Sequence, residues 1–352
     1  MLRDPISRGL VTICAGLLIG GCDQTTAPDL GQDPAATGLL VAAHMDDPKA
    51  TLLVSGLEGA LGSTIGPDGA LYVAEGAAGR ISRIDPRSGA TTTFASGLPE
   101  RVLPPEGGVM DVAFIDRTAY ALVSAVGSDV GGSDVVGIYR VDGPQSFTVV
   151  ADIGEFNVLN PPTIPFQIDV PSGYQYALQT YRGGFLVTDG HLNRVLRVTL
   201  DGEITELIAF DNIVPTGLEV KGNRVYLALA GPVPHLPQDG KVVSFGPKSP
   251  TETEVVASGA SLLVDVEFGR GRSLYALSQG DFPVGSVPGS PALPNTGALV
   301  GVTGDGTFTV ITDGLNQPTS VEFIGNTAYV VTLGGEIWKI EDVSDPPFGR
   351  PR

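Results

Sequence analysis

The sequence predicts an all-β protein, a six-bladed β-propeller closed by an N-terminal strand that completes the last blade. An apolar strand phrase, usually containing Tyr, recurs six times at intervals of roughly 40 to 65 residues, a spacing typical of propeller blades. The chain has 48 Gly and 28 Pro between short apolar runs, and almost no amphipathic helical pattern. The six phrases are residues 71–75, 118–123, 184–189, 224–229, 273–278 and 327–332.

Residues 1–21 have the parts of a lipoprotein signal peptide. Arg3 and Arg8 give a basic start, and residues 9–20 form an apolar stretch. This stretch is too short to span a bilayer, which needs about 20 residues. It ends in the tetrapeptide Ile-Gly-Gly-Cys at 19–22, which resembles the bacterial lipobox.

The use of cysteine favours a lipid anchor at Cys22. The chain has two cysteines, Cys14 and Cys22, and both precede the expected domain, so that domain has no disulfide framework to include Cys22. We expect lipidated Cys22 to hold the protein at a membrane of the bacterial cell envelope, on its extracytoplasmic side. An ordinary secretory leader with a chance cysteine is the alternative.

The composition divides the rest of the chain into three parts. Small and polar residues with two prolines fill 23–47, so we expect a flexible tether over 22–48. We expect the propeller over 49–343 and a C-terminal tail over 344–352.

Each repeat divides into four short strands separated by turn residues. In the first repeat the strands are 62–65, 71–75, 80–85 and 90–96. Third strands recur at 137–142, 194–199, 241–245, 298–302 and 336–340. Fourth strands recur at 147–152, 204–210, 254–258 and 308–313, and the sixth repeat ends after its third strand.

The missing fourth strand is expected at the other end of the chain. Residues 50–57 (ATLLVSGL) match the fourth-strand phrases at 255–260 (VVASGA) and 310–315 (VITDGL). An N-terminal strand that completes the sixth blade closes the ring and removes two exposed sheet edges. This complementarity favours six blades over five or seven.

Four carboxylates are candidates for the central tunnel. Alignment of the first strands, which line the tunnel of a propeller, places Asp111 and Asp265 in opposite blades. The ends of the second strands add Glu75 and Asp189. Convergence of these oxygen ligands would suit Ca²⁺. The alternative is that the acids accept hydrogen bonds from backbone amides.

Four expected loops exceed ordinary hairpin turns: 126–135, 156–175, 231–240 and 279–297. Three of them join second to third strands, at the same edge of the ring. Their apolar residues suggest a surface for a ligand or partner; these are Phe156, Val158, Phe166, Phe282 and Val287.

Three loop residues are further candidates. His191 and Asn193 lie in the loop after the second strand of the third repeat, and His235 lies in a proline-rich loop of the fourth. His191 could serve as a base at the tunnel mouth. For Asn193 the structural alternative is an unusual backbone geometry in a turn.

The net charge is −18, from 39 acidic and 21 basic residues. Such a surface repels phosphate backbones, so we expect no nucleic-acid partner. The charge favours solubility, or the collection of cations at the tunnel mouth.

Several phrases resemble the ScyD/ScyE family of six-bladed propellers. They are 66–75 (GPDGALYVAE), 83–86 (RIDP), 215–218 (PTGL), 265–268 (DVEF) and 318–321 (PTSV). The resemblance spans about residues 49 to 343, although 58–62 (EGALG) departs from the family's Asn-Pro-x-Gly. It implies a six-bladed propeller and carries no catalytic motif to this chain.

Two hypotheses on function follow. The first is a monomeric, lipid-anchored module that binds a small molecule or protein through its loops. The second is a metal-dependent, lactonase-like hydrolase that uses the acidic tunnel. A quinoprotein dehydrogenase is weaker, because an anionic quinone needs a basic, histidine-bearing pocket.

Overall fold

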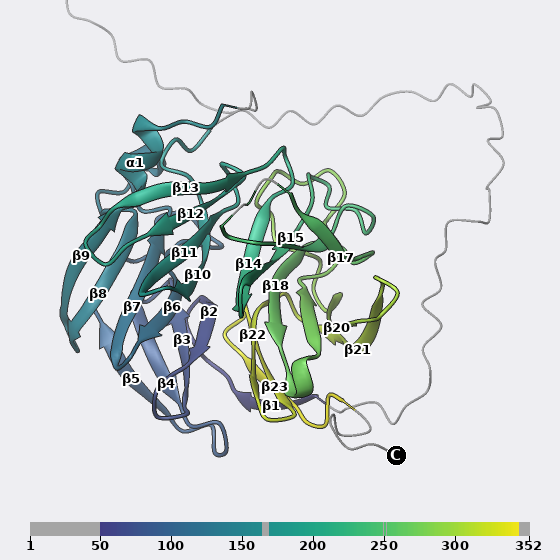
Figure 1. The fold of residues 1–352 in the computed structure, drawn as a ribbon. Helices are drawn as coiled ribbons and strands as arrows, with labels where there is room; N and C mark the ends of the chain where they lie inside the picture. The colour runs from purple at the N-terminus through teal and green to yellow at the C-terminus, as the bar shows by residue number, and fades with distance from the viewer. Residues whose placement is uncertain (1–49, 164–168, 249, 251, 345–352) are drawn as a thin grey trace, which may run out of the picture. The chain divides into compact units, whose positions relative to one another are not determined.

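The structure, a computed structural model, describes residues 50–163, 169–248, 250 and 252–344. In these residues, six four-stranded antiparallel sheets form a six-bladed β-propeller (Figure 1), which confirms the predicted fold. No helix in this part of the chain is long and apolar enough to cross a membrane. The expected signal peptide, Cys22 and the tether lie outside the described residues, as does the tail beyond Ser344.

Each blade contains four consecutive strands, except that the sixth takes one from the N-terminus. Blades one and two contain β2 (Ala60–Ile65), β3 (Leu71–Glu75), β4 (Arg80–Ile84), β5 (Thr91–Ser96), β6 (Gly108–Ile115), β7 (Thr118–Ser124), β8 (Gly137–Gly143) and β9 (Ser146–Asp152). Blades three and four contain β10 (Gln175–Tyr181), β11 (Gly184–Asp189), β12 (Arg194–Val198), β13 (Ile204–Ala209), β14 (Pro215–Lys221), β15 (Arg224–Leu229), β16 (Lys241–Phe245) and β17 (Glu254–Ser258). Blades five and six contain β18 (Leu263–Phe268), β19 (Leu274–Ser278), β20 (Gly297–Val302), β21 (Phe308–Leu315), β22 (Pro318–Ile324), β23 (Thr327–Thr332), β24 (Ile337–Ile340) and β1 (Ala50–Val54).

The predicted closure of the ring is confirmed. β1 pairs antiparallel with β24, and Ala50 lies opposite Ile340. In Figure 1 the label of β1 stands beside that of β23. The strand ends at Val54, earlier than the expected residue 57. Leu57 is nevertheless buried, and its backbone N–H donates to the Gly335 carbonyl at 3.0 Å. The closing segment therefore contributes both strand pairing and apolar burial.

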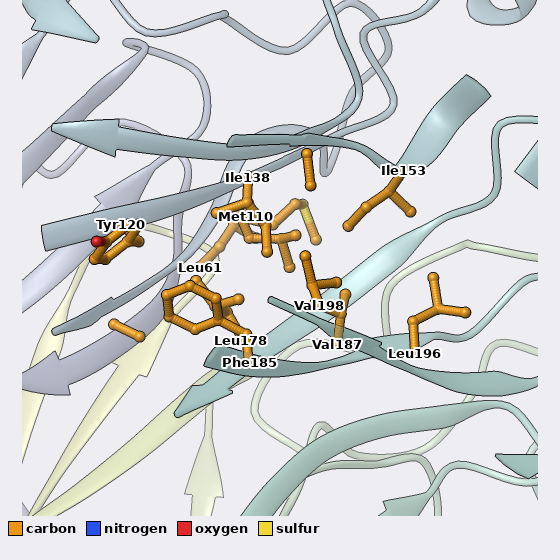
Figure 2. Close-up of a cluster of buried hydrophobic side chains, with 13 residues drawn as sticks. Leu61, Met110, Tyr120, Ile138, Ile153, Leu178, Phe185, Val187, Leu196 and Val198 are labelled. Atoms are coloured by element: carbon orange, nitrogen blue, oxygen red, sulfur yellow. The ribbon is translucent and has the colours of Figure 1, made fainter. Parts of the chain in front are cut away.

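Apolar side chains fill the spaces between neighbouring blades. One cluster joins blades two and three, with Met110, Ile138, Phe185 and Leu196 among its fully buried members (Figure 2). Full burial of such a side chain stabilises the fold by about 1.5–3 kcal/mol. These clusters hold the first strands around the axis and so position the tunnel side chains.

One helix interrupts the expected loop at 156–175. α1 (Ile153–Leu159) begins after Asp152, whose side chain accepts a hydrogen bond from the Glu155 N–H at 2.8 Å. This arrangement satisfies an otherwise unpaired amide of the first helical turn. The helix has seven residues, too few for a clear period of 3.6, so the sequence pattern did not reveal it. The other helical turns among the described residues are η1 (Ser128–Val130) and η2 (Arg270–Arg272).

Candidate functional site

The connections between strands define two faces of the propeller. The start of each first strand pairs with the end of the second, as Ala60 does with Glu75, so both open on the same side. We call this side the loop face; it comprises residues 55–60, 75–80, 96–108, 124–137, 152–163, 169–175, 189–194, 209–215, 229–241, 258–263, 278–297, 313–318 and 332–337. The opposite side is the turn face; it comprises 65–71, 83–92, 115–118, 140–148, 181–184, 197–204, 221–224, 245–248, 250, 252–254, 268–274, 302–308, 324–327 and 339–344.

All four long loops open on the loop face. Three of them join second to third strands, as expected, and residues 156–175 join blade two to the first strand of blade three on the same side. Backbone hydrogen bonds join loops that precede first strands to second-to-third loops in blades one, three, four, five and six. The Gly190 N–H, for example, donates to the Tyr174 carbonyl at 3.0 Å, and the Gly231 N–H to the Ile213 carbonyl at 2.9 Å.

The apolar loop residues divide into exposed and packed groups. Val158 and Val287 are exposed, as expected, whereas Phe282 is buried and Phe156 is half-buried under the Arg194 guanidinium. Phe166 lies outside the described residues.

Residues at the aligned position of the six first strands, Asp111 and Asp265 among them, line a cavity on the axis. Its lining includes one residue from each blade, and these six are Gly62, Asp111, Ala177, Gly217, Asp265 and Ser320. The alignment of repeats on the sequence therefore placed the tunnel residues at the correct positions.

Asp111 and Asp265 make the same contacts in opposite halves of the ring. Asp111 accepts hydrogen bonds from the N–H groups of Val112 at 2.8 Å and of Leu178, in the next blade, at 2.7 Å. Asp265 accepts from Val266 and from Val321, in its own next blade, both at 2.8 Å. Each aspartate thus ties its first strand to the following one.

A glycine in the preceding blade leaves room for each aspartate. A Cβ atom at Gly62 would collide with the Asp111 carboxylate, and one at Gly217 with the Asp265 carboxylate. The sequence of residue types at this level, Gly-Asp-Ala followed by Gly-Asp-Ser, therefore follows from packing.

Glu75 stabilises blade one and does not line the cavity. Its carboxylate is fully buried and accepts from the Arg80 guanidinium at 2.6 and 2.8 Å, the Ser82 hydroxyl at 2.5 Å and the Glu58 N–H at 2.6 Å. Both of its oxygens are engaged within the blade, so the expected convergence with Asp111 is not what the structure has.

Asp189 also bonds inside the loop face. Its Oδ2 accepts from the side-chain amides of Asn157 at 2.7 Å and Gln175 at 2.8 Å. Its Oδ1 accepts from the N–H groups of Tyr174 at 3.1 Å and Leu192 at 2.9 Å. The expected set of four tunnel carboxylates is thus reduced to Asp111 and Asp265.

Replacement of Asp189 by asparagine tests this structural role. The Asp189→Asn amide would direct an N–H₂ group at donors that the carboxylate now satisfies, so we expect a loss of about 2–4 kcal/mol in the free energy of unfolding. Urea unfolding of the variant gives the value. Asp211→Asn is the control, since this exposed acid lies on the same face. Equal stability of the two variants would contradict the role.

The three candidate loop residues connect loop segments. The Asn193 side chain accepts from the N–H groups of Ile213 and Val214, both at 2.8 Å, and its φ is 54°. His191 Nε2 accepts from the Val170 N–H at 3.2 Å. The structural alternative for Asn193 therefore fits the contacts observed.

His235 is buried, with Nδ1 2.7 Å from the Gly231 carbonyl oxygen. Because a carbonyl only accepts, Nδ1 carries the proton. Burial lowers the pKa of His235, which keeps the ring neutral, and the ring packs edge-on against Phe282 at 5.1 Å. His235 thus connects the long loops of blades four and five.

Sequence reasoning missed a second acidic level in the tunnel. Two residues beyond the aspartate level, blades four, five and six place Glu219, Glu267 and Glu322, and blade three places Gln179. Gln179 donates to Glu219, and Glu267 accepts from the Phe268 N–H at 2.7 Å. Because side chains alternate along a strand, a step of two residues from the aligned level would have found this set.

Burial in the tunnel raises the pKa values of its acids. It raises the pKa of Asp265 to about 6 and that of Glu219 to about 7. The pKa values of Asp111, Glu267 and Glu322 are raised well above their ordinary range, first by burial and then by the neighbouring carboxylates. Removal from water and mutual repulsion both favour the neutral form.

Tyr176 and Glu106 lie at the loop-face end of the tunnel. Tyr176 packs against buried residues of blades two and three and also of blades five and six, so its ring lies across the axis. Its hydroxyl is buried without a hydrogen-bond partner among the described residues. Glu106, from the connection between blades one and two, bonds to Gln279 of blade five, and burial raises its pKa to about 7.

The cavity on the axis, lined by Asp111, Asp265 and Tyr176 among others, has a volume of about 60 Å³. One water needs about 10–15 Å³ by this measure, so the space is large enough for several waters. Among the described residues, no group of three or more His, Cys, Asp or Glu is placed to hold a metal ion. Both aspartates accept hydrogen bonds from backbone amides, so they would have to give up these bonds to bind Ca²⁺.

Comparison with known structures supports the fold. No protein-family model matches the chain, and no curated protein matches it. A gluconolactonase from Xanthomonas campestris is 11% identical, with a TM-score of 0.57 over 83% of this chain and 89% of that one. The PQQ-bound aldose sugar dehydrogenase of Streptomyces coelicolor is 14% identical, with a TM-score of 0.54 over 84% and 98%.

A catalytically inactive variant of virginiamycin B lyase from Staphylococcus aureus, with quinupristin, is 16% identical. Its TM-score is 0.50 over 83% of this chain and 98% of that one. Six-bladed propellers are thus the structural neighbours of this chain, and identities this low show the fold alone. Membership of the ScyD/ScyE family stays a prediction.

Proposed function

We propose that the protein is a lipid-anchored, extracytoplasmic recognition module that binds a partner through its loop face. The observation that carries this proposal is the distribution of exposed apolar side chains. Fourteen large hydrophobic residues are exposed in the described chain, and nine of them lie on the loop face. These nine are Val102, Leu103, Val158, Leu159, Val233, Leu236, Val284, Val287 and Leu293.

These residues come from connections of four different blades. Of the other five, four lie on outer strands and one, Leu200, lies on the turn face. Exposed apolar groups concentrated on one face mark interaction sites in soluble proteins. The hydrogen bonds between neighbouring loops hold this surface in place, which lowers the entropy lost on binding.

Photo-crosslinking from single positions tests the proposal. A benzoyl-phenylalanine in place of Val284, which is fully exposed, is expected to form a crosslinked product in bacterial cells that express the full chain. The same group in place of Leu200, 42% exposed on the turn face, is the matched control and is expected to give none. Equal products from both positions, or none from Val284, would contradict recognition through the loop face.

Lipidation of Cys22 is the part of the proposal that sets its location in the cell envelope. The sequence at 19–22 and the absence of other cysteines after residue 14 support it. We expect Cys22→Ala to move the protein from the membrane fraction to the soluble fraction, or to leave it unprocessed. Mass spectrometry of the natural protein gives the readout. A soluble protein without acyl mass, starting at another residue, would overturn the anchor.

A lactonase-like, metal-dependent hydrolase is the second candidate. It is favoured by two aspartates that line one cavity and by the likeness of fold to a gluconolactonase. Calorimetric titration with Ca²⁺ and a lactone-hydrolysis assay distinguish it. Metal-dependent turnover that Asp265→Asn abolishes would establish this candidate in place of the recognition module.

A further inference from the structure

Charge is divided unequally between the two faces of the propeller. The loop face contains fifteen acidic residues and four basic ones. The turn face contains eleven acidic residues and twelve basic ones, so it is close to neutral. Solubility alone needs a net charge and gives no reason to place it on one side.

On the loop face, the excess of acidic over basic residues is larger among the exposed side chains. Nine of the loop-face acids are exposed: Glu58, Glu100, Asp129, Asp134, Glu155, Asp169, Asp211, Asp281 and Asp313. None of the four basic residues of this face is exposed in the described chain. Arg80 bonds to Glu75, Arg194 bonds to Glu206, and Arg101 donates to the Pro105 carbonyl at 2.6 Å. A partner that approaches the loop face therefore meets carboxylates and apolar groups.

The acids and the apolar residues occupy the same segments. On α1, Glu155 precedes Val158 and Leu159. Glu100 likewise precedes Val102 and Leu103, and Asp281 precedes Val284. We propose that the loop face binds a basic, amphipathic polypeptide segment, in which apolar side chains cover the exposed Val and Leu residues and Lys or Arg side chains face the carboxylates. The inference rests on the proposed recognition function and names the chemistry of the partner.

Complementary charge raises the rate of encounter and selects the orientation of the partner, and apolar contact in the centre supplies affinity. The same surface disfavours other partners. An anionic lipid surface, a nucleic acid and a quinone carboxylate would each meet like charge on the loop face. The proposal therefore commits to a cationic polypeptide.

The test uses the full chain and two synthetic peptides of the same amphipathic pattern, one of Leu and Lys and one of Leu and Glu. We expect the Leu/Lys peptide to bind, with an affinity that falls as salt is added, and the Leu/Glu peptide not to bind. Glu100→Lys, Glu155→Lys and Asp281→Lys combined should weaken the Leu/Lys complex by about tenfold or more.

The matched control reverses three acids of the turn face: Glu203→Lys, Glu252→Lys and Glu341→Lys combined. This variant has the same net charge as the loop-face variant, so unchanged affinity would assign the effect to position. Equal loss in both variants, binding of the Leu/Glu peptide, or stronger binding to phosphatidylglycerol vesicles than to the Leu/Lys peptide would overturn the inference.

The two proposals fail separately. A crosslink from Val284 without binding of the Leu/Lys peptide would overturn the cationic partner and keep the recognition module. Absence of both would overturn the module as well.

Discussion

A chain shortened to begin at Glu58 is expected to lose several kcal/mol of its free energy of unfolding and to aggregate. The deletion removes β1, which pairs with β24 over Ala50–Ile340, Thr51–Lys339, Leu52–Trp338 and Val54–Ile337. It also removes the buried Leu57, whose loss alone costs about 1.5–3 kcal/mol. The unpaired β24 would then present a sheet edge that can pair with a second copy.

A chain that begins at Ala50 is the control, because it keeps all of β1 and lacks the same N-terminal residues. Thermal unfolding and size-exclusion chromatography compare the two chains. If the shorter chain stayed monomeric with an unchanged Tm, the closing strand would not stabilise the ring.

The second large effect is a fall in Tm as the pH rises from about 5 to about 8, measured with a chelator present. Burial raises the folded-state pKa of Asp265 to about 6 and those of Glu106 and Glu219 to about 7. In the unfolded chain these groups titrate near 4. Between the two values the folded state binds more protons, so the free energy of unfolding falls as pH rises. A shift of two pKa units at Asp265 corresponds to about 3 kcal/mol.

Other titrating groups do not reverse this sign. Asp85, Asp142 and Asp305 have lowered pKa values, from hydrogen bonds that stabilise their charged forms, so they act below about pH 4. His235 has a lowered pKa through burial, and its contribution is lost as pH falls below about 6.5. His235 alone thus opposes the effect of six acids whose pKa values are raised. These acids are Glu106, Asp111, Glu219, Asp265, Glu267 and Glu322.

Glu322→Gln provides the matched variant for the pH effect. Its amide cannot ionise, so we expect a Tm above that of the natural chain at pH 8 and a smaller difference at pH 5. A Tm that rises between pH 5 and 8 in the natural chain would contradict the burial of neutral acids. Restoration of the Tm at pH 8 by added Ca²⁺ would instead favour the metal-dependent candidate.

The fold was predictable because its signals are local and repeated. A strand such as 71–75 and its turn with Gly69, whose φ is 76°, recur in similar form in each blade. Closure was predictable because residues 50–57 match a fourth strand in sequence. The helix α1 was missed because its seven residues are too few to show a helical period, and because its stability depends on packing, which is tertiary in origin.

The sequence predicted where the cavity residues lie, but it predicted the contacts of the candidate carboxylates only in part. Alignment placed Asp111 and Asp265 at the cavity, yet it also nominated Glu75 and Asp189, which bond elsewhere. The partners of Asp189 come from residues 157, 174, 175 and 192, and no sequence pattern links Asn157 to that carboxylate. The charge difference between the faces needs only the sequence and the order of strands.

Hydrogen exchange of the full chain with and without the Leu/Lys peptide tests recognition through the loop face. We expect slower exchange in 97–107, 125–136 and 279–296 of the loop face, and unchanged exchange in the turns at 116–117, 200–202 and 222–223. Slower exchange in those turns, with unchanged exchange in the long loops, would contradict it.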